Sequence, residues 1–207
     1  ETLDLPYAMS HGLKNEGAKI TAQLLETTDA MEVVNEILIP ALDSAGKLFE
    51  QGKIFLPQLI QTASVAQAAF EVIKTTLIER NAAPVSRGEI VLATVKGDIH
   101  DIGKNIVRVL LENYGYTVLD LGRDVPCQLV ADTAKEHGVK LVGLSALMTT
   151  TLGAMEETIQ LVKQSCPDCK IVVGGAVLTA DYAEKIGADF YAKDAMETVA
   201  VAKEVVG

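Results

Sequence analysis

An aspartate and a histidine two residues apart, Asp98 and His100, are the pair in this chain best suited to chemistry. One imidazole nitrogen can bind a metal while the other donates a hydrogen bond to a carboxylate. A metal held by protein side chains alone needs three or four ligands. One histidine suffices where the metal arrives inside a macrocycle and lacks only an axial ligand. The pair alone leaves open both this role and an ordinary structural contact in a loop.

The loop around this pair does not match the common phosphate-binding loops. A Walker A loop has four residues between its glycines and Ser or Thr after its Lys. Here five residues separate Gly97 from Gly103, and Asn105 follows Lys104. The GxGxxG pattern of dinucleotide-binding loops is absent as well. Nucleotide binding at this loop is therefore disfavoured.

The chain has three cysteines, Cys127, Cys166 and Cys169. So few cysteines indicate a reducing setting, and we expect a cytoplasmic protein. Cys166 and Cys169 form a single CPDC, and the sequence has no second CxxC that could complete a zinc site. We interpret it as a surface turn between a helix and a strand, with a redox role left open.

Composition narrows the class of protein. The chain has 207 residues, of which 49% are hydrophobic, and its net charge is −10. This balance is typical of a globular protein with a sizeable core. Binding to nucleic acid or to an anionic membrane is disfavoured, because either surface attracts basic patches. No apolar run is long enough to cross a bilayer, and nothing resembles a signal peptide. Whether the chain is free-standing or part of a longer protein stays open.

The elements that must position Asp98 and His100 fall into two halves. Residues 1–82 show apolar residues at helical spacing and predict a domain of about four helices. Thr28 and Asp29 are a plausible helix start, and Pro40 should kink or divide that helix. Gly52 should end it, and Pro57 should lie in the first turn of the next one. A polar break at residues 83–88 is the predicted linker.

Residues 89–207 alternate between β-branched runs and helical patterns. The predicted strands are residues 90–95, 117–121, 140–147, 170–173 and 189–192. The predicted helices are residues 102–114, 127–137, 152–164, 180–186 and 196–205. This alternation predicts an α/β domain with a doubly wound, five-stranded parallel sheet of the flavodoxin or Rossmann type. Ligands of such sheets bind at the carboxyl ends of the strands, where the loops that begin at Gly97, Ser145, Gly174 and Ala192 should converge.

Three motifs in these loops carry a resemblance. Asp98-x-His100-x-x-Gly103, Ser145-x-Leu147 and Gly174-Gly175 occur in this order and at the strand ends. Together they resemble the signature of cobalamin-binding domains, with nearly the family's spacing. The resemblance implies that His100 is the lower axial ligand to cobalt in place of the cofactor's own base. Asp98 would hydrogen-bond the other nitrogen of His100. Thr151 stands where the family has a serine, and it would continue the relay with the same hydroxyl.

The same resemblance implies a cobalamin site around these motifs. Gly174 and Gly175 would let the nucleotide tail pass close to the backbone, and Ala195 would close its slot. The residues so implied in the α/β half are Gly97, Asp98, Ile99, His100, Asp101, Ile102, Gly103, Ser145, Leu147, Thr149, Gly174, Gly175 and Ala195.

The helical half resembles the cap that methyl-transferring corrinoid proteins place over the upper face of cobalt. By position, Phe49 and Leu56 correspond to the two cap residues over the methyl group, with Leu59 beside them. Asn35 falls where some relatives have a polar residue. The sequence of residues 55–61 is most similar to the cobalamin module of methionine synthase. Ordinary packing inside a helical bundle is the competing interpretation of Phe49, Leu56 and Leu59.

The resemblance implies a methyl carrier that alternates between cob(I)alamin and methylcobalamin. Its partners would be methyl-donor and methyl-acceptor methyltransferase domains or subunits and a reductive activation partner, and it would not turn over alone. The main hypothesis is the cobalamin module of a methionine synthase. The alternative is a stand-alone corrinoid protein of a methanol, methylamine or O-demethylase system. A cobalamin-based light sensor, a mutase subunit and a domain without corrinoid are weaker alternatives.

Overall fold

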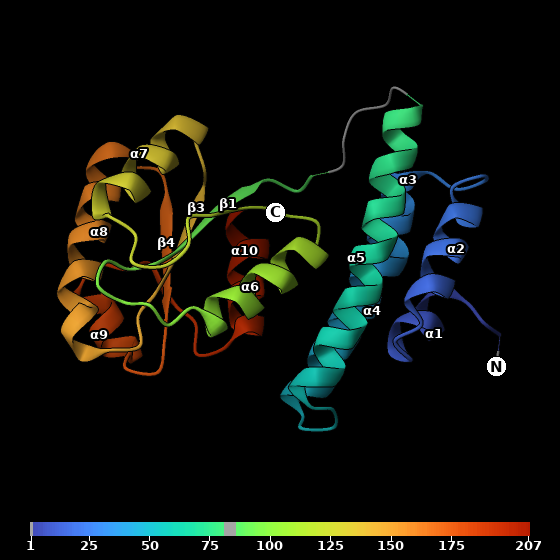
Figure 1. Ribbon diagram of the computed structural model, residues 1–207, viewed down its shortest axis with the longest axis horizontal. Coiled ribbons are helices and arrows are strands. Elements are labelled where there is room, and N and C mark those ends of the chain that lie inside the picture. Colours follow the sequence, from blue (N-terminus) through green and yellow to red (C-terminus); the bar gives the residue numbers. More distant parts are fainter. Residues whose placement is uncertain (1, 81–85) are drawn as a thin grey trace. The chain divides into compact units, whose positions relative to one another are not determined.

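The computed structural model describes residues 2–80 and 86–207. The chain divides into two compact units, residues 1–86 with 112–115 and residues 87–111 with 116–207. We call them the helical unit and the α/β unit (Figure 1). Residues 83–85 of the predicted linker at 83–88 lie outside the described residues. The predicted domain limits, 1–82 and 89–207, stay predictions.

The helical unit contains α1 (Leu5–Ser10), α2 (Lys14–Leu24), α3 (Ala30–Val33), α4 (Ile39–Glu50) and α5 (Leu56–Glu79). Asp29 caps α3, since its carboxylate accepts from the Met31 N–H. A π-helical segment, Val34–Leu38, joins α3 to α4 without a break. Pro40 explains this segment, because it has no N–H to continue the regular ladder. The predicted division of the helix at Pro40 therefore takes the form of a local change in winding.

The α/β unit has one sheet of five parallel strands, as predicted, and their order is β2-β1-β3-β4-β5. The strands are β1 (Glu89–Thr94), β2 (Thr117–Asp120), β3 (Leu141–Ser145), β4 (Lys170–Gly174) and β5 (Phe190–Tyr191). The helices are α6 (Ile102–Asn113), α7 (Cys127–His137), α8 (Leu152–Ser165), α9 (Ala180–Lys185) and α10 (Ala195–Val205). This is the doubly wound order in which the first strand lies inside the sheet.

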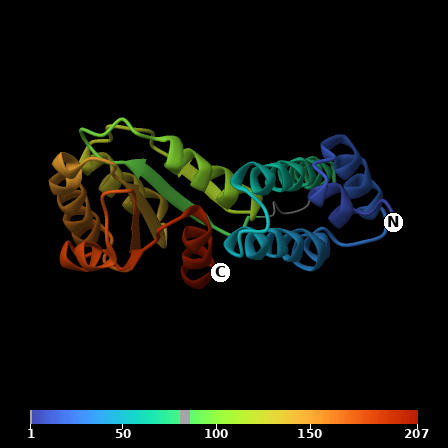
Figure 2. The ribbon, with the colours of Figure 1, turned by 90° about the horizontal axis from the view of Figure 1, so that it is seen from below.

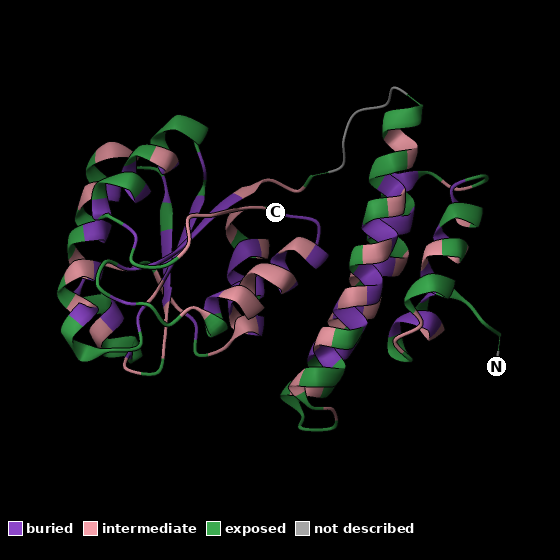
Figure 3. Cartoon of the chain, viewed as in Figure 1, coloured by how far each residue is buried: buried purple, intermediate pink, exposed green. Residues whose placement is uncertain are grey.

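Helices cover both faces of this sheet (Figures 1 and 2). On one face, side chains from β1, β3 and β4 pack against α7, α8 and α9 in a continuous apolar core, which includes Val91, Val142 and Ile171. On the other face lie α6 and α10. The central strands are buried along most of their length (Figure 3). Such strands are expected to be apolar throughout, which is why the sequence shows runs and not alternation.

Strand β3 is shorter than the predicted residues 140–147, because its carboxyl end turns away from the sheet. Ala146 still donates to the Gly174 carbonyl, at 3.2 Å. The next two N–H groups, of Leu147 and Met148, donate instead to the Asp98 carboxylate. A short 3-10 turn, Thr149–Thr151, then leads into α8. This turn brings the loop after β3 against the loop after β1.

Candidate functional site

The loop between β1 and α6 places His100 beside Asp98. The His100 ring nitrogen Nδ1 lies 2.7 Å from Asp98 Oδ1, and the His100 N–H donates to the same oxygen at 3.0 Å. The Asp98 side chain has no exposed surface, whereas the His100 side chain is 44% exposed. The loop therefore buries the carboxylate and presents the imidazole.

The loop after β3 holds the second oxygen of Asp98. Oδ2 accepts from the Leu147 N–H at 2.7 Å, the Met148 N–H at 3.3 Å and the Thr151 hydroxyl at 3.0 Å. The same hydroxyl lies 2.8 Å from the Met148 carbonyl oxygen, so its single proton is shared between two acceptors. Asp98, His100 and Thr151 thus form a connected chain of hydrogen-bonded groups, as the resemblance implies.

Asp98 is an anion in this setting. Burial alone would raise the pKa of Asp98, but N–H groups of His100 and Leu147 and the His100 and Thr151 side chains hold that pKa well below its usual range. An ionised carboxylate only accepts hydrogen bonds. Nδ1 of His100 therefore carries the proton that points at Asp98. In the neutral imidazole, Nε2 is then left with its lone pair, which is the form of histidine that binds a metal.

A cavity of about 680 Å³ opens beside His100, between the sheet and helices α6 and α10. Its walls include most of the α/β residues implied by the resemblance. These are Ile99, His100, Asp101, Ile102, Gly103, Ser145, Leu147, Gly174, Gly175 and Ala195. Asp98 and Thr151 are buried, Gly97 is exposed, and none of the three lines the cavity. Thr149 is exposed in the 3-10 turn and does not line it either.

Sequence reasoning missed the floor of the cavity, which is formed by Leu92, Gly143 and Val172 in the middle of their strands. Gly143 was the available signal, because a glycine inside an apolar strand often marks a close approach. Sequence reasoning also missed Thr94, whose hydroxyl lies 3.0 Å from that of Ser145 in the cavity wall. Thr94 has no exposed surface. The Thr94 hydroxyl thereby holds the Ser145 hydroxyl in place in the cavity wall.

The backbone at position 175 requires glycine for a structural reason. Its φ is +137°, and a Cβ added there would overlap the carbonyl oxygen of Ala146. At Gly174, an added Cβ would lie 3.1 Å from the Ala192 carbonyl oxygen. The two glycines therefore let the loops after β3, β4 and β5 pack closely, whether or not a ligand passes them.

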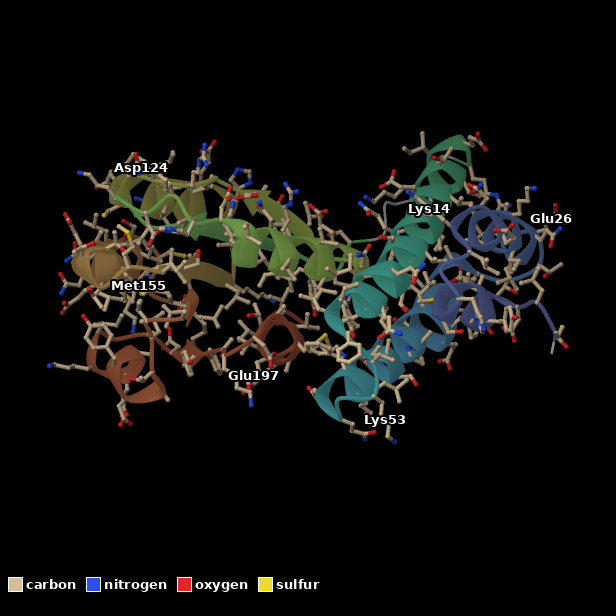
Figure 4. All side chains as sticks on the ribbon, turned by 60° about the horizontal axis from the view of Figure 1, so that its bottom comes forward. Lys14, Glu26, Lys53, Asp124, Met155 and Glu197 are labelled. Atoms are coloured by element: carbon tan, nitrogen blue, oxygen red, sulfur yellow. The ribbon has the colours of Figure 1, made fainter. Side chains whose placement is uncertain are left out.

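The helical unit holds the other predicted residues. Phe49, at the end of α4, and Leu56, at the start of α5, are half-buried, and Phe55 between them is 74% exposed. Lys53 marks the same hairpin in Figure 4. Leu59 is only 1% exposed and belongs to the core of the helical unit. Asn35 is exposed in the π-helical segment.

The residues around His100 fit a corrinoid. Among the described residues no group of three or more His, Cys, Asp or Glu side chains could hold a metal, so a metal here needs ligands other than the protein's. Ile99 is 60% and Ile102 is 79% exposed, which gives His100 an apolar rim. A Cβ added to Gly103 would meet no described atom within 4 Å, so the α6 end of the site has free space. A single histidine, an apolar rim and a cavity of about 680 Å³ suit a macrocycle with a tail.

Comparisons with known proteins agree with this chemistry. Two family models, each described as a B12 binding domain, match residues 88–200 and 4–74. The chain is 43% identical over 180 residues to dimethylamine corrinoid protein 1 of Methanosarcina acetivorans, over 86% of this chain and 84% of that one. It is 38% identical to trimethylamine corrinoid protein 1 of Methanosarcina mazei, over 90% and 88%.

Solved structures give the same result. A cobalamin-binding protein from Desulfitobacterium hafniense superposes with a TM-score of 0.80 at 32% identity, over the whole of both chains. The methanol:cobalamin methyltransferase complex from Methanosarcina barkeri superposes with a TM-score of 0.85 at 27% identity, over 98% of this chain and 78% of that one. Separately, none of the described helices is long and apolar enough to cross a membrane.

Proposed function

Since the chain belongs to the cobalamin-binding corrinoid proteins and takes cobalamin as its cofactor, we propose that it carries a methyl group from a methylated amine to a thiol acceptor. Bound cobalamin supplies a cobalt centre that can take up and release a methyl group. The geometry of His100, Asp98 and the neighbouring cavity is the observation that supports this proposal most directly. The donor and acceptor sites would lie on partner methyltransferases, and a reductive activation partner would restore the carrier.

Methylated amines are the donor class we favour over the folate donor of a methionine synthase. The main hypothesis from sequence, a methionine synthase module, finds no support among the relatives reported above. Those relatives are named as dimethylamine and trimethylamine corrinoid proteins, and they match this chain along most of their length. The alternative, a corrinoid protein of a methylamine or methanol system, is therefore the better interpretation.

In this proposal His100 would bind cobalt through Nε2. The Asp98 anion keeps the Nδ1 proton in place and stabilises positive charge on the ring. The Thr151 O–H could donate its hydrogen bond to either Asp98 or the Met148 carbonyl oxygen. Asp98 and Thr151 would thus adjust how strongly His100 donates its Nε2 lone pair to cobalt.

The cavity would take the nucleotide tail of the cofactor, with Ser145 as its polar contact and Ala195 near its far wall. Phe49 and Leu56 would shield the upper face of cobalt, because both keep apolar surface exposed at the tip of one helical hairpin. Leu59 would support them from inside the helical unit. The family match over residues 4–74 supports a role for the helical unit in the cobalamin protein.

Reconstitution with methylcobalamin tests the axial ligand. The wild-type protein should bind corrinoid and give the absorption spectrum of histidine-ligated cobalt, whereas His100→Gly should bind corrinoid and give the spectrum of cobalt without its lower ligand. His137→Ala is the matched control, since His137 lies at the end of α7 and pairs with Glu89. A wild-type protein that binds no corrinoid, or a His100→Gly spectrum like that of wild type, would overturn the assignment.

A second experiment tests the donor. The reduced corrinoid form is mixed with dimethylamine and a dimethylamine methyltransferase, and in parallel with methyltetrahydrofolate and a folate-dependent methyltransferase. Methylation, read from the absorption spectrum, is expected only with the amine system. Methylation by the folate system alone would contradict the amine proposal and favour the methionine synthase hypothesis.

A further inference from the structure

Asp124 has an unusual backbone conformation close to the Asp98–His100 loop. Its φ is +51°, and among residues 2–80 and 86–207 every other residue with a positive φ is glycine. Asp tolerates the left-handed region better than most side chains, but at some cost in free energy. Figure 4 labels Asp124 on the segment that follows β2, at the surface of the α/β unit. Such a conformation persists only where neighbouring contacts hold it.

Asp124 contacts the loop before His100 in two ways. Its Oδ1 accepts a hydrogen bond from the Gly97 N–H at 2.7 Å. Its own N–H donates to the Asp98 carbonyl oxygen at 2.8 Å. Gly97 itself has a φ of +86°. The two left-handed residues therefore fit together, and Asp124 fixes the backbone on both sides of the Gly97–Asp98 peptide.

The segment that carries Asp124 is itself held firmly against β1. The Leu121 N–H donates to the Leu92 carbonyl at 2.9 Å, and the Val125 N–H donates to the Thr94 carbonyl at 3.1 Å. Val95 and Val125 also form a parallel bridge. Hydrogen bonds on either side of Asp124 thus maintain its conformation, so that its side chain is directed to Gly97.

Asp98 is consequently held from two neighbouring strands. The loop after β3 binds its carboxylate, through Leu147, Met148 and Thr151. The segment after β2 binds its backbone, through Asp124. We infer that Asp124 is a positioning residue that fixes the Asp98–His100 loop in the geometry His100 needs to bind cobalt. This inference rests on the proposed function for the cobalt ligand, but the hydrogen bond to Gly97 can be tested without cofactor.

Three substitutions separate the side chain of Asp124 from its backbone conformation. Asp124→Asn keeps an oxygen acceptor and tolerates a positive φ. Asp124→Gly removes the acceptor but relieves the backbone. Asp124→Ala removes the acceptor and keeps the cost of a Cβ in this region. Each variant is measured twice: by hydrogen–deuterium exchange of the Gly97 amide in the cofactor-free protein, and by the ratio of histidine-ligated to unligated cobalt in the absorption spectrum with bound cobalamin.

We expect Asp124→Asn to resemble wild type in both measurements. Asp124→Gly and Asp124→Ala should both speed exchange at Gly97 and lower the ligation ratio by about threefold to tenfold, the size of one net hydrogen bond. The inference would be overturned if Asp124→Gly kept the wild-type ratio of histidine-ligated to unligated cobalt. It would also be overturned if Asp124→Asn lowered that ratio as much as Asp124→Ala does. If the wild-type protein binds no corrinoid, the proposed function fails, while unchanged exchange in Asp124→Gly would overturn the Gly97 contact separately.

Discussion

Asp98 combines two properties that oppose each other, a fully buried side chain and a negative charge. Five hydrogen-bond donors from His100, Leu147, Met148 and Thr151 surround its two oxygens. An amide in its place would direct an NH₂ group at some of these donors. Asp98→Asn should therefore lower the free energy of unfolding by about 2–3 kcal/mol, measured by urea denaturation without cofactor.

Acid should act through the same group. The pKa of Asp98 is depressed in the folded protein, so the folded state releases this proton more readily than the unfolded state. The stability that Asp98 contributes is present above the unfolded carboxyl pKa of about 4 and is lost as pH falls below it. Wild type should therefore lose stability more steeply below this pH than Asp98→Asn does. Parallel acid profiles for the two proteins would show that the charge of Asp98 contributes nothing.

The two cysteines of the CPDC should differ in reactivity. Burial, with a smaller effect of the neighbouring Cys166, raises the pKa of the Cys169 thiol to about 12. Since only the thiolate reacts, Cys169 should resist iodoacetamide at pH 8 in the folded protein, whereas the half-buried Cys166 should be modified. Peptide mass spectrometry before and after denaturation measures both sites. Rapid modification of Cys169 in the folded protein would contradict the buried, protonated state.

At the scale of the elements, two glycines at the same sheet edge should respond differently to one methyl group. Gly175→Ala should cost about 2–4 kcal/mol of stability, because its Cβ overlaps a backbone oxygen that cannot move without separating two strand ends. Gly103→Ala should change the stability of the cofactor-free protein by less than about 0.5 kcal/mol, since its Cβ enters open space. Corrinoid titration should then show weaker binding for Gly103→Ala, and equal affinity would mean that no ligand uses that space.

The elements themselves were largely predictable from the sequence. Helix α7 begins and ends at the predicted residues, Cys127 and His137, and the parallel sheet follows from the alternation of runs and helices. Strand β3 ends two residues before its predicted limit, because Leu147 and Met148 exchange sheet pairing for the Asp98 carboxylate. That exchange depends on a partner about 50 residues away, which local patterns do not report.

The site was predictable in the same way: local motifs were found, whereas contacts between distant residues were not. The motifs identified Asp98, His100 and Thr151, whose contacts lie within and between the predicted loops. They did not identify Thr94 or Asp124, since a threonine in a strand and an aspartate before Val-Pro have no distinctive local pattern. The role of each appears only when a neighbouring strand places its partner within hydrogen-bond distance. Residues outside the motifs that act only through a neighbouring strand are thus harder to predict than residues within the motifs.

At the scale of the whole molecule, the proposed carrier needs the helical unit to act on a cofactor that the α/β unit binds. Phe49 and Leu56 suit this role, because they keep apolar surface exposed, whereas Leu59 packs inside its own unit. Phe49→Ala should leave corrinoid affinity near that of wild type but speed photolysis of bound methylcobalamin, because a smaller side chain confines the methyl radical less. Leu59→Ala should instead lower the free energy of unfolding by about 2–4 kcal/mol, the usual cost of emptying a buried leucine site. Photolysis of Phe49→Ala at the wild-type rate would mean that the helical unit leaves the upper face of cobalt unshielded at this position.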